Sequence, residues 1–100
     1  MYLVISHHYC KPGQLEVARA RMDKNAAQLI SEPGCLYRYR MERPEFPNIL
    51  SALTAWHDVE DYQRNREKRF GGKHDLSDTP YERIEHEGFH VRASQGLNPT

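Results

Sequence analysis

The stretch CLYRYRMERPEFPNILSALTAW, residues 35–56, decides the fold because it predicts two strands joined by a turn. Its first part, CLYRYRME at 35–42, alternates apolar or aromatic residues with charged ones, which is typical of a strand with two different faces. RPEFPN at 43–48 holds two prolines and predicts a turn, and ILSALTAW at 49–56 predicts the most apolar strand of the chain. We therefore expect a pair of consecutive strands in the middle of the sequence.

A predicted helix flanks this pair on each side. Between residues 14 and 31 the apolar side chains recur every three or four positions, which predicts an amphipathic helix closed by EPG at 32–34. After the pair, Asp58 is a good N-cap for a second helix that runs to about Arg69 and ends at GGK, residues 71–73.

The outer segments complete the pattern. YLVISHHYC at 2–10 and YERIEHEGFHVRA at 81–93 predict two more strands, with KPG at 11–13 as a turn and HDLSDTP at 74–80 as a loop. The order βαββαβ predicts an α+β, ferredoxin-like fold: a four-stranded antiparallel sheet with two helices on one face. Right-handed crossovers place strand 2–10 centrally, beside strands 49–56 and 81–93. Residues 1–93 form the single predicted domain, and 94–100 a flexible tail.

Composition excludes several classes of protein. Lys+Arg and Asp+Glu are both 14, and this balance argues against binding to nucleic acid. No segment approaches the roughly 20 apolar residues of a membrane helix, and the N-terminal segment lacks a signal-peptide pattern, so we expect a cytoplasmic protein. Cys10 and Cys35 flank the first predicted helix and are expected to be free thiols. No metal-ligating pattern of histidines or carboxylates is present, so we expect no metal site.

The chain is polar for its size, with 38% hydrophobic residues and a mean hydropathy of −0.87. The helices cover one face of the predicted sheet, while tyrosine, leucine and isoleucine side chains also alternate onto the other. A second copy of the chain is the simplest cover for that face, so we expect a homodimer.

Several of these features occur in a characteristic order. KPG follows the first strand, EPGC closes the first helix, an alternating strand comes next, and the third strand ends at Trp56 just before a helix that starts with acidic residues. Over nearly the whole chain this order resembles the antibiotic biosynthesis monooxygenase superfamily, the dimeric α+β barrel proteins. The resemblance implies a homodimer whose two sheets form a barrel, with a pocket in each subunit between sheet and helices.

The resemblance also implies site residues. In members similar to anthrone oxygenases, the tryptophan that ends the third strand and a tyrosine six residues later face the pocket, and Trp56 and Tyr62 match both. Those enzymes use an asparagine four residues before the tryptophan, where this chain has Ala52.

The haem-degrading branch has a different signature. It carries an asparagine on the first strand, at or near Ser6 here, and a second tryptophan at about the place of Asn65. His74 lies near its axial histidine. Because two of these three features are missing, the resemblance disfavours haem as a cofactor.

Strand alternation places Leu50, Ala52, Thr54 and Trp56 on one face of the sheet, and the resemblance implies that this face is the helix side. Trp56 is then either a core residue or a pocket wall, and the small side chains beside it favour a pocket. Tyr62 likewise either anchors the second helix or hydrogen-bonds a substrate.

His8 shares the helix-facing side of the first strand with Val4 and Ser6. A buried histidine is usually a hydrogen-bonded core residue, but histidines titrate near neutral pH, which suits His8 to remove a phenolic proton. The arginines at 38 and 40 and the basic residues between 64 and 73 are either solvated or attract an anionic substrate.

The favoured function is a monooxygenase that uses O₂ on a small aromatic quinol or phenol without metal or flavin. In this hypothesis His8 is the base, Tyr62 donates a hydrogen bond, and Trp56 and Phe70 are walls. Ser6, Ala52, Thr54 and His74 complete the expected substrate site. The alternatives are a non-oxidative isomerase-type enzyme on the same fold and a non-catalytic protein that binds haem or another flat ligand.

Overall fold

The computed structural model describes residues 1–70, 75–93 and 95–96. The elements are β1 (Tyr2–Cys10), α1 (Leu15–Leu29), β2 (Cys35–Glu42), β3 (Ile49–Trp56), α2 (Val59–Phe70) and β4 (Tyr81–His90). All strand pairs are antiparallel and form one sheet in the order β2-β3-β1-β4. This confirms the predicted ferredoxin-like α+β fold and the central place of β1.

The last strand is shorter than predicted. It ends at His90 rather than at residue 93, because His90 pairs with Tyr2, the first residue of β1, and no residue of β1 remains to pair beyond it. The predicted tail at 94–100 and the predicted turn and loop between 71 and 80 lie partly outside the described residues.

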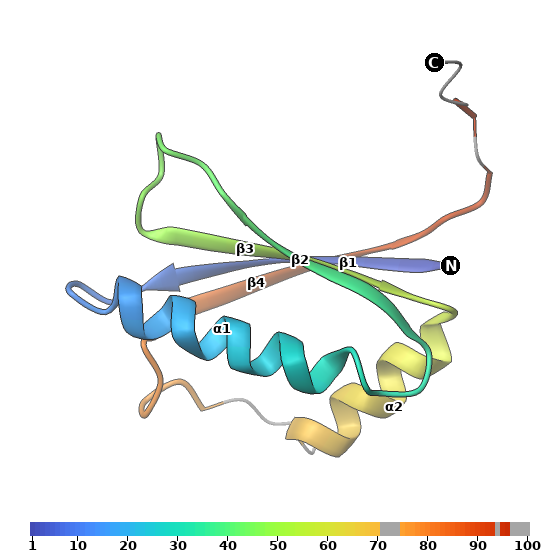
Figure 1. Ribbon diagram of the computed structural model, residues 1–100, viewed down its shortest axis with the longest axis horizontal. Helices are drawn as coiled ribbons and strands as arrows, with labels where there is room; N and C mark the ends of the chain where they lie inside the picture. Colours follow the sequence, from blue (N-terminus) through green and yellow to red (C-terminus); the bar gives the residue numbers. More distant parts are fainter. Residues whose placement is uncertain (71–74, 94, 97–100) are drawn as a thin grey trace.

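Both helices lie on the same side of the sheet (Figure 1). The buried residues of α1 are Ala18, Met22 and Leu29, and all three belong to the predicted apolar stripe. Two clusters form the core: one joins Ala18 and Met22 to Leu50 of β3, and the other joins Leu29 to Val4 and Trp56. The second cluster lies toward α2, whose Tyr62 packs against it.

The start of α2 is set by its contact with the turn before β2. Asp58 Oδ1 accepts a hydrogen bond of 3.0 Å from the Asp61 N–H, which confirms the predicted N-cap. In the EPG turn, Gly34 has φ +86°, and a side chain there would collide with Asp61. The Gly34 carbonyl accepts a bond of 2.7 Å from the His57 N–H. The turn and the helix N-terminus therefore determine each other's positions.

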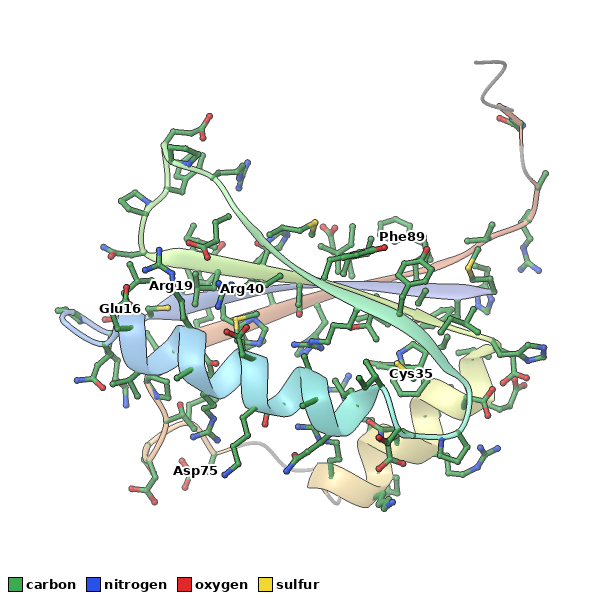
Figure 2. The ribbon with its side chains drawn as sticks, in the orientation of Figure 1. Glu16, Arg19, Cys35, Arg40, Asp75 and Phe89 are labelled. Atoms are coloured by element: carbon green, nitrogen blue, oxygen red, sulfur yellow. The ribbon has the colours of Figure 1, made fainter. Side chains whose placement is uncertain are left out.

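Ion pairs tie α1 to β2 near the start of the helix. Arg19 pairs with Glu16 and, at 2.7 Å, with Glu42, while Arg40 pairs with Asp23 at 3.0 Å and with Glu42 at 3.1 Å. Figure 2 shows Glu16, Arg19 and Arg40 at this edge of the molecule. Pairs this exposed contribute about 0–1 kcal/mol each, so they orient the helix more than they stabilise it.

The sheet face opposite the helices is open in the single chain (Figure 1). Tyr39 and Phe89 are 58% and 49% exposed, and Tyr37 and Met41 lie on the same face. Figure 2 shows Phe89 on the side of the sheet away from the helices. This face could bury apolar area against a second copy, and the homodimer stays a prediction.

The remaining expectations concern the thiols and membrane segments. Cys10 and Cys35 are both free, as predicted. Within the described ranges, no helix combines the length and the apolar character needed to cross a membrane.

Candidate functional site

A cavity of about 190 Å³ lies between the sheet and the two helices. Every helix and strand contributes at least one lining side chain, so the whole fold is needed to form it. A cavity of about 150 Å³ is large enough to hold benzene. The volume therefore suits one substituted aromatic ring.

The structure brings five of the predicted site residues together around this cavity. They are Ser6 and His8 from β1, Thr54 and Trp56 from β3, and Tyr62 from α2. The four strand residues alternate onto the helix side, as strand alternation together with the resemblance predicted.

The other three predicted residues have different outcomes. Ala52 does not line the cavity; it is fully buried in the core cluster with Ala18 and Met22, beneath α1. Phe70 ends α2, but its side chain lies outside the described residues, as does all of His74.

Trp56 is at once a core residue and a wall. It is 2% exposed and packs against Val4 and Leu29, yet it also lines the cavity. Its ring centre lies 6.2 Å from that of Tyr62, with the planes inclined at 60°. Both roles expected from the sequence, core residue and pocket wall, therefore apply to Trp56.

The orientation of His8 identifies its basic nitrogen. Its Nδ1 lies 3.3 Å from the carbonyl oxygen of Leu50. Because a carbonyl only accepts, Nδ1 carries the proton, and the lone pair of the neutral ring is on Nε2. The ring is also held against Tyr81, with ring centres 4.8 Å apart.

The hydroxyl hydrogen of Tyr62 is not used in its hydrogen bond to Arg66. Its oxygen accepts a bond of 2.8 Å from Arg66 Nη1. A guanidinium has no acceptor, so the phenolic O–H of Tyr62 does not point its hydrogen at Arg66. That O–H can donate to an oxygen of a bound molecule.

Comparisons with known proteins bear on the fold. No family model matches the sequence, and no curated protein matches it significantly. Solved structures do match: a proposed antibiotic biosynthesis monooxygenase from Deinococcus radiodurans has a TM-score of 0.81 at 11% identity, over 98% of this chain and 99% of that one. An antibiotic biosynthesis monooxygenase crystal structure has a TM-score of 0.74 at 14% identity, over 93% and 100% of the two chains.

A third match is an asparagine-to-alanine variant of SnoaB, a cofactor-independent oxygenase from Streptomyces nogalater. Its TM-score is 0.73 at 16% identity, over 93% of this chain and 95% of that one. The chain has the fold of the antibiotic biosynthesis monooxygenases. This confirms the single-chain fold that the sequence resemblance implied, and the dimeric barrel stays a prediction. At these identities the likeness establishes the fold and not the reaction.

Two buried hydrogen-bond donors of the cavity could not be predicted from the sequence. Tyr81 and Asn65 line the cavity, and neither Tyr81 Oη nor Asn65 Nδ2 has a hydrogen-bond partner among the described residues. Burial raises the pKa of the Tyr81 phenol, which keeps it protonated. A register shift between Tyr9 and Cys10 pairs Tyr81 with Cys10 and turns it to the helix side, which alternation along β4 did not reveal.

The charged residues of the cavity share one sign. Four arginines line it, and no aspartate or glutamate does among the described residues; the arginines are Arg21, Arg38, Arg66 and Arg69. From the sequence alone, the basic residues of the second helix could either be solvated or attract an anion.

One group of side chains outside the cavity has metal-ligand character. His57, Asp58 and Asp61 place their ligand atoms within 4.8 Å of one another at the start of α2. Their bonds already have a structural role, since Asp58 caps the helix and Asp61 pairs with Arg64 at 2.9 Å.

Proposed function

We propose that this protein is a cofactor-independent monooxygenase that acts on a small aromatic quinol or phenol. The observation that carries the proposal is the cavity that brings His8, Trp56 and Tyr62 around a space of one aromatic ring. The fold shared with SnoaB, a cofactor-independent oxygenase, supports the same class of reaction.

The chemistry follows from these three side chains. The substrate ring stacks in the cavity against Trp56, and Nε2 of His8 accepts the phenolic proton. Tyr62 donates a hydrogen bond to the resulting phenolate oxygen and so stabilises its charge.

The phenolate then transfers one electron to O₂, and the two radicals combine to form a C–O bond at a ring carbon. His8 returns its proton to the peroxide. The O–O bond breaks as the ring carbon loses its hydrogen, so a quinone and one water are formed. One oxygen atom of O₂ is in the quinone and the other in the water. All four electrons come from the substrate, so the reaction needs no external reductant.

The test is O₂ consumption by metal-depleted protein with a panel of substituted phenols and quinols. We expect His8→Gln to lower kcat by about 10²- to 10⁴-fold, the usual contribution of a general base. His57→Gln is the matched control, because His57 is exposed and lies outside the cavity. No O₂ uptake across the panel, or full activity of His8→Gln, would contradict the proposal.

A non-oxidative isomerase is the second candidate, and one observation favours it. His86 of β4 also lines the cavity and pairs with Ser6 of β1, so two histidines on neighbouring strands face one space. They could act as acid and base on a small carbonyl compound. This candidate predicts turnover without O₂, whereas the monooxygenase requires it.

The working unit that we propose is a homodimer without metal, flavin or haem. The exposed apolar residues on the open sheet face support the pairing, since a second sheet would cover them. The assay with metal-depleted protein tests the cofactor part of the proposal directly.

A further inference from the structure

Positive charge is concentrated in the cavity although the chain as a whole is neutral. Net charge is +0, yet Arg21 of α1, Arg38 of β2, and Arg66 and Arg69 of α2 all line the same space. No carboxylate of the described residues lines it. A cleft with charges of one sign and low-dielectric walls attracts ions of the opposite sign.

Arg38 is the best-placed of these residues. It is half-buried on the helix side of β2, and its Nη1 donates a hydrogen bond of 3.0 Å to Thr54 Oγ1, a second lining residue. Arg40 lies two residues along on the same face, but it pairs with Asp23 and Glu42. Within the described residues, no carboxylate pairs with Arg38.

The charge on Arg38 is costly in this position. Burial lowers the pKa of Arg38, and the nearby positive charge of Arg69 lowers it further. The other groups that act on it are Cys35 and Tyr81, which are neutral as long as they are protonated. Buried charges in proteins are usually paired, so Arg38 has the environment of a residue whose counter-ion is a bound molecule.

Two neutral hydrogen-bond donors also favour an anionic group in the cavity. Tyr81 Oη and Asn65 Nδ2 are buried beside the cavity without partners among the described residues. A carboxylate or phosphate has several acceptor lone pairs and no donor, and therefore matches donors better than a neutral hydroxyl group does.

We propose that the aromatic molecule bound in the cavity carries an anionic oxygen group, a carboxylate or a phosphate, and that Arg38 binds this group. The inference deepens the proposed function by naming the substrate class, and it rests on that function only for the aromatic ring. Binding itself requires no turnover, so it can be tested separately.

The experiment is isothermal titration calorimetry with two pairs of probes that differ in charge. One pair is 2,5-dihydroxybenzoate and 2,5-dihydroxybenzamide, and the other is phenyl phosphate and phenol. We expect at least one anion to bind about tenfold or more tightly than its neutral partner, as suits a charge-assisted hydrogen bond. The pair that shows the larger preference distinguishes a carboxylate from a phosphate.

Variants assign the preference to Arg38. Arg38→Gln should remove the preference and leave the affinity for the neutral probe within about twofold, because only the charged contact is lost. Arg38→Lys keeps the charge and should retain part of the preference. Arg64→Gln, on α2 but outside the cavity, is the control and should bind like the unsubstituted protein.

Three results would overturn the inference: equal binding within both pairs, no binding of any probe, or an undiminished preference in both Arg38 variants. These outcomes are separable from a failure of the proposed function. Arg38-dependent anion binding without O₂ uptake leaves the anion site and removes the monooxygenase. Rapid oxidation of uncharged quinols, with no preference for anions in binding, would support the monooxygenase and remove the anion site.

Discussion

Replacing Tyr81 by phenylalanine is expected to stabilise the protein. The side chain is 3% exposed, and its hydroxyl has no hydrogen-bond partner among the described residues. A buried polar group left without a partner costs about 1–3 kcal/mol, whereas a hydroxyl in an ordinary hydrogen bond contributes about 1 kcal/mol. Phenylalanine keeps the ring that packs against His8 and removes only the hydroxyl. We therefore expect Tyr81→Phe to raise the free energy of unfolding by about 1 kcal/mol, the low end of that range.

The assay is urea unfolding followed by circular dichroism, at one protein concentration because a dimer's stability depends on it. In a domain of this size, 1 kcal/mol corresponds to a rise in Tm of about 4–8 °C. Tyr62→Phe is the matched control. Its hydroxyl is hydrogen-bonded to Arg66, so its loss should lower the stability by about 0.5 kcal/mol.

A Tyr81→Phe protein less stable than the unsubstituted one by about 1 kcal/mol would refute the reasoning, since the hydroxyl would then have a partner in the folded chain. The same substitution should weaken binding of the anionic probes. Greater stability together with weaker binding would show that the hydroxyl is kept for a ligand.

Three further predictions concern the core, the ion pairs and the open face. Trp56→Ala should lower the free energy of unfolding by about 3–5 kcal/mol, measured by urea unfolding, because a nearly buried indole is lost from the core. The hydrogen bond from Arg19 lowers the pKa of Glu42 below its ordinary 4.5, so the pair stabilises the fold above pH 4.5 and this contribution is lost as the pH falls below 4.5. Glu42→Gln lacks this contribution and should therefore lose less stability than the unsubstituted protein between pH 5 and pH 3. Unfolding midpoints measured across this pH range check the prediction. Tyr39→Arg should convert the predicted dimer to a monomer, measured by light scattering, because it places a charge on the open sheet face; an unchanged mass would exclude this face as the interface.

The fold could be predicted because local signals agreed along the whole chain. The alternation in residues 35–42 correctly separated the face of Arg38 and Arg40 from the face of Tyr37, Tyr39 and Met41. The N-cap at Asp58 began the second helix where the pattern placed it. The end of β4 could not be predicted, because it depends on where β1 begins in the register between the two strands.

The site was predicted only in part, for reasons that involve distant contacts. Alternation found Ser6 and His8, but it gave the same prediction for Ala52, which α1 covers. Arg38 and Arg40 look alike in the sequence, and they are distinguished by the positions of Asp23 and Glu42, which pair with Arg40 and not with Arg38. Tyr81 was hidden by an irregularity in the pairing of β4 with β1, where Tyr9 and Cys10 are consecutive but their partners jump from Arg83 to Tyr81.

Gly34 influences the shape of the cavity although it does not line it. The glycine packs directly against the start of α2, and α2 supplies several of the cavity's lining side chains. A larger residue at this turn would collide with the Asp61 side chain, and a shift of α2 that relieves the collision would change the distance between this helix and the sheet. Selection for bulkier substrates would for that reason be expected to act on a remote turn as well as on the walls, and a library for changing substrate size should include it.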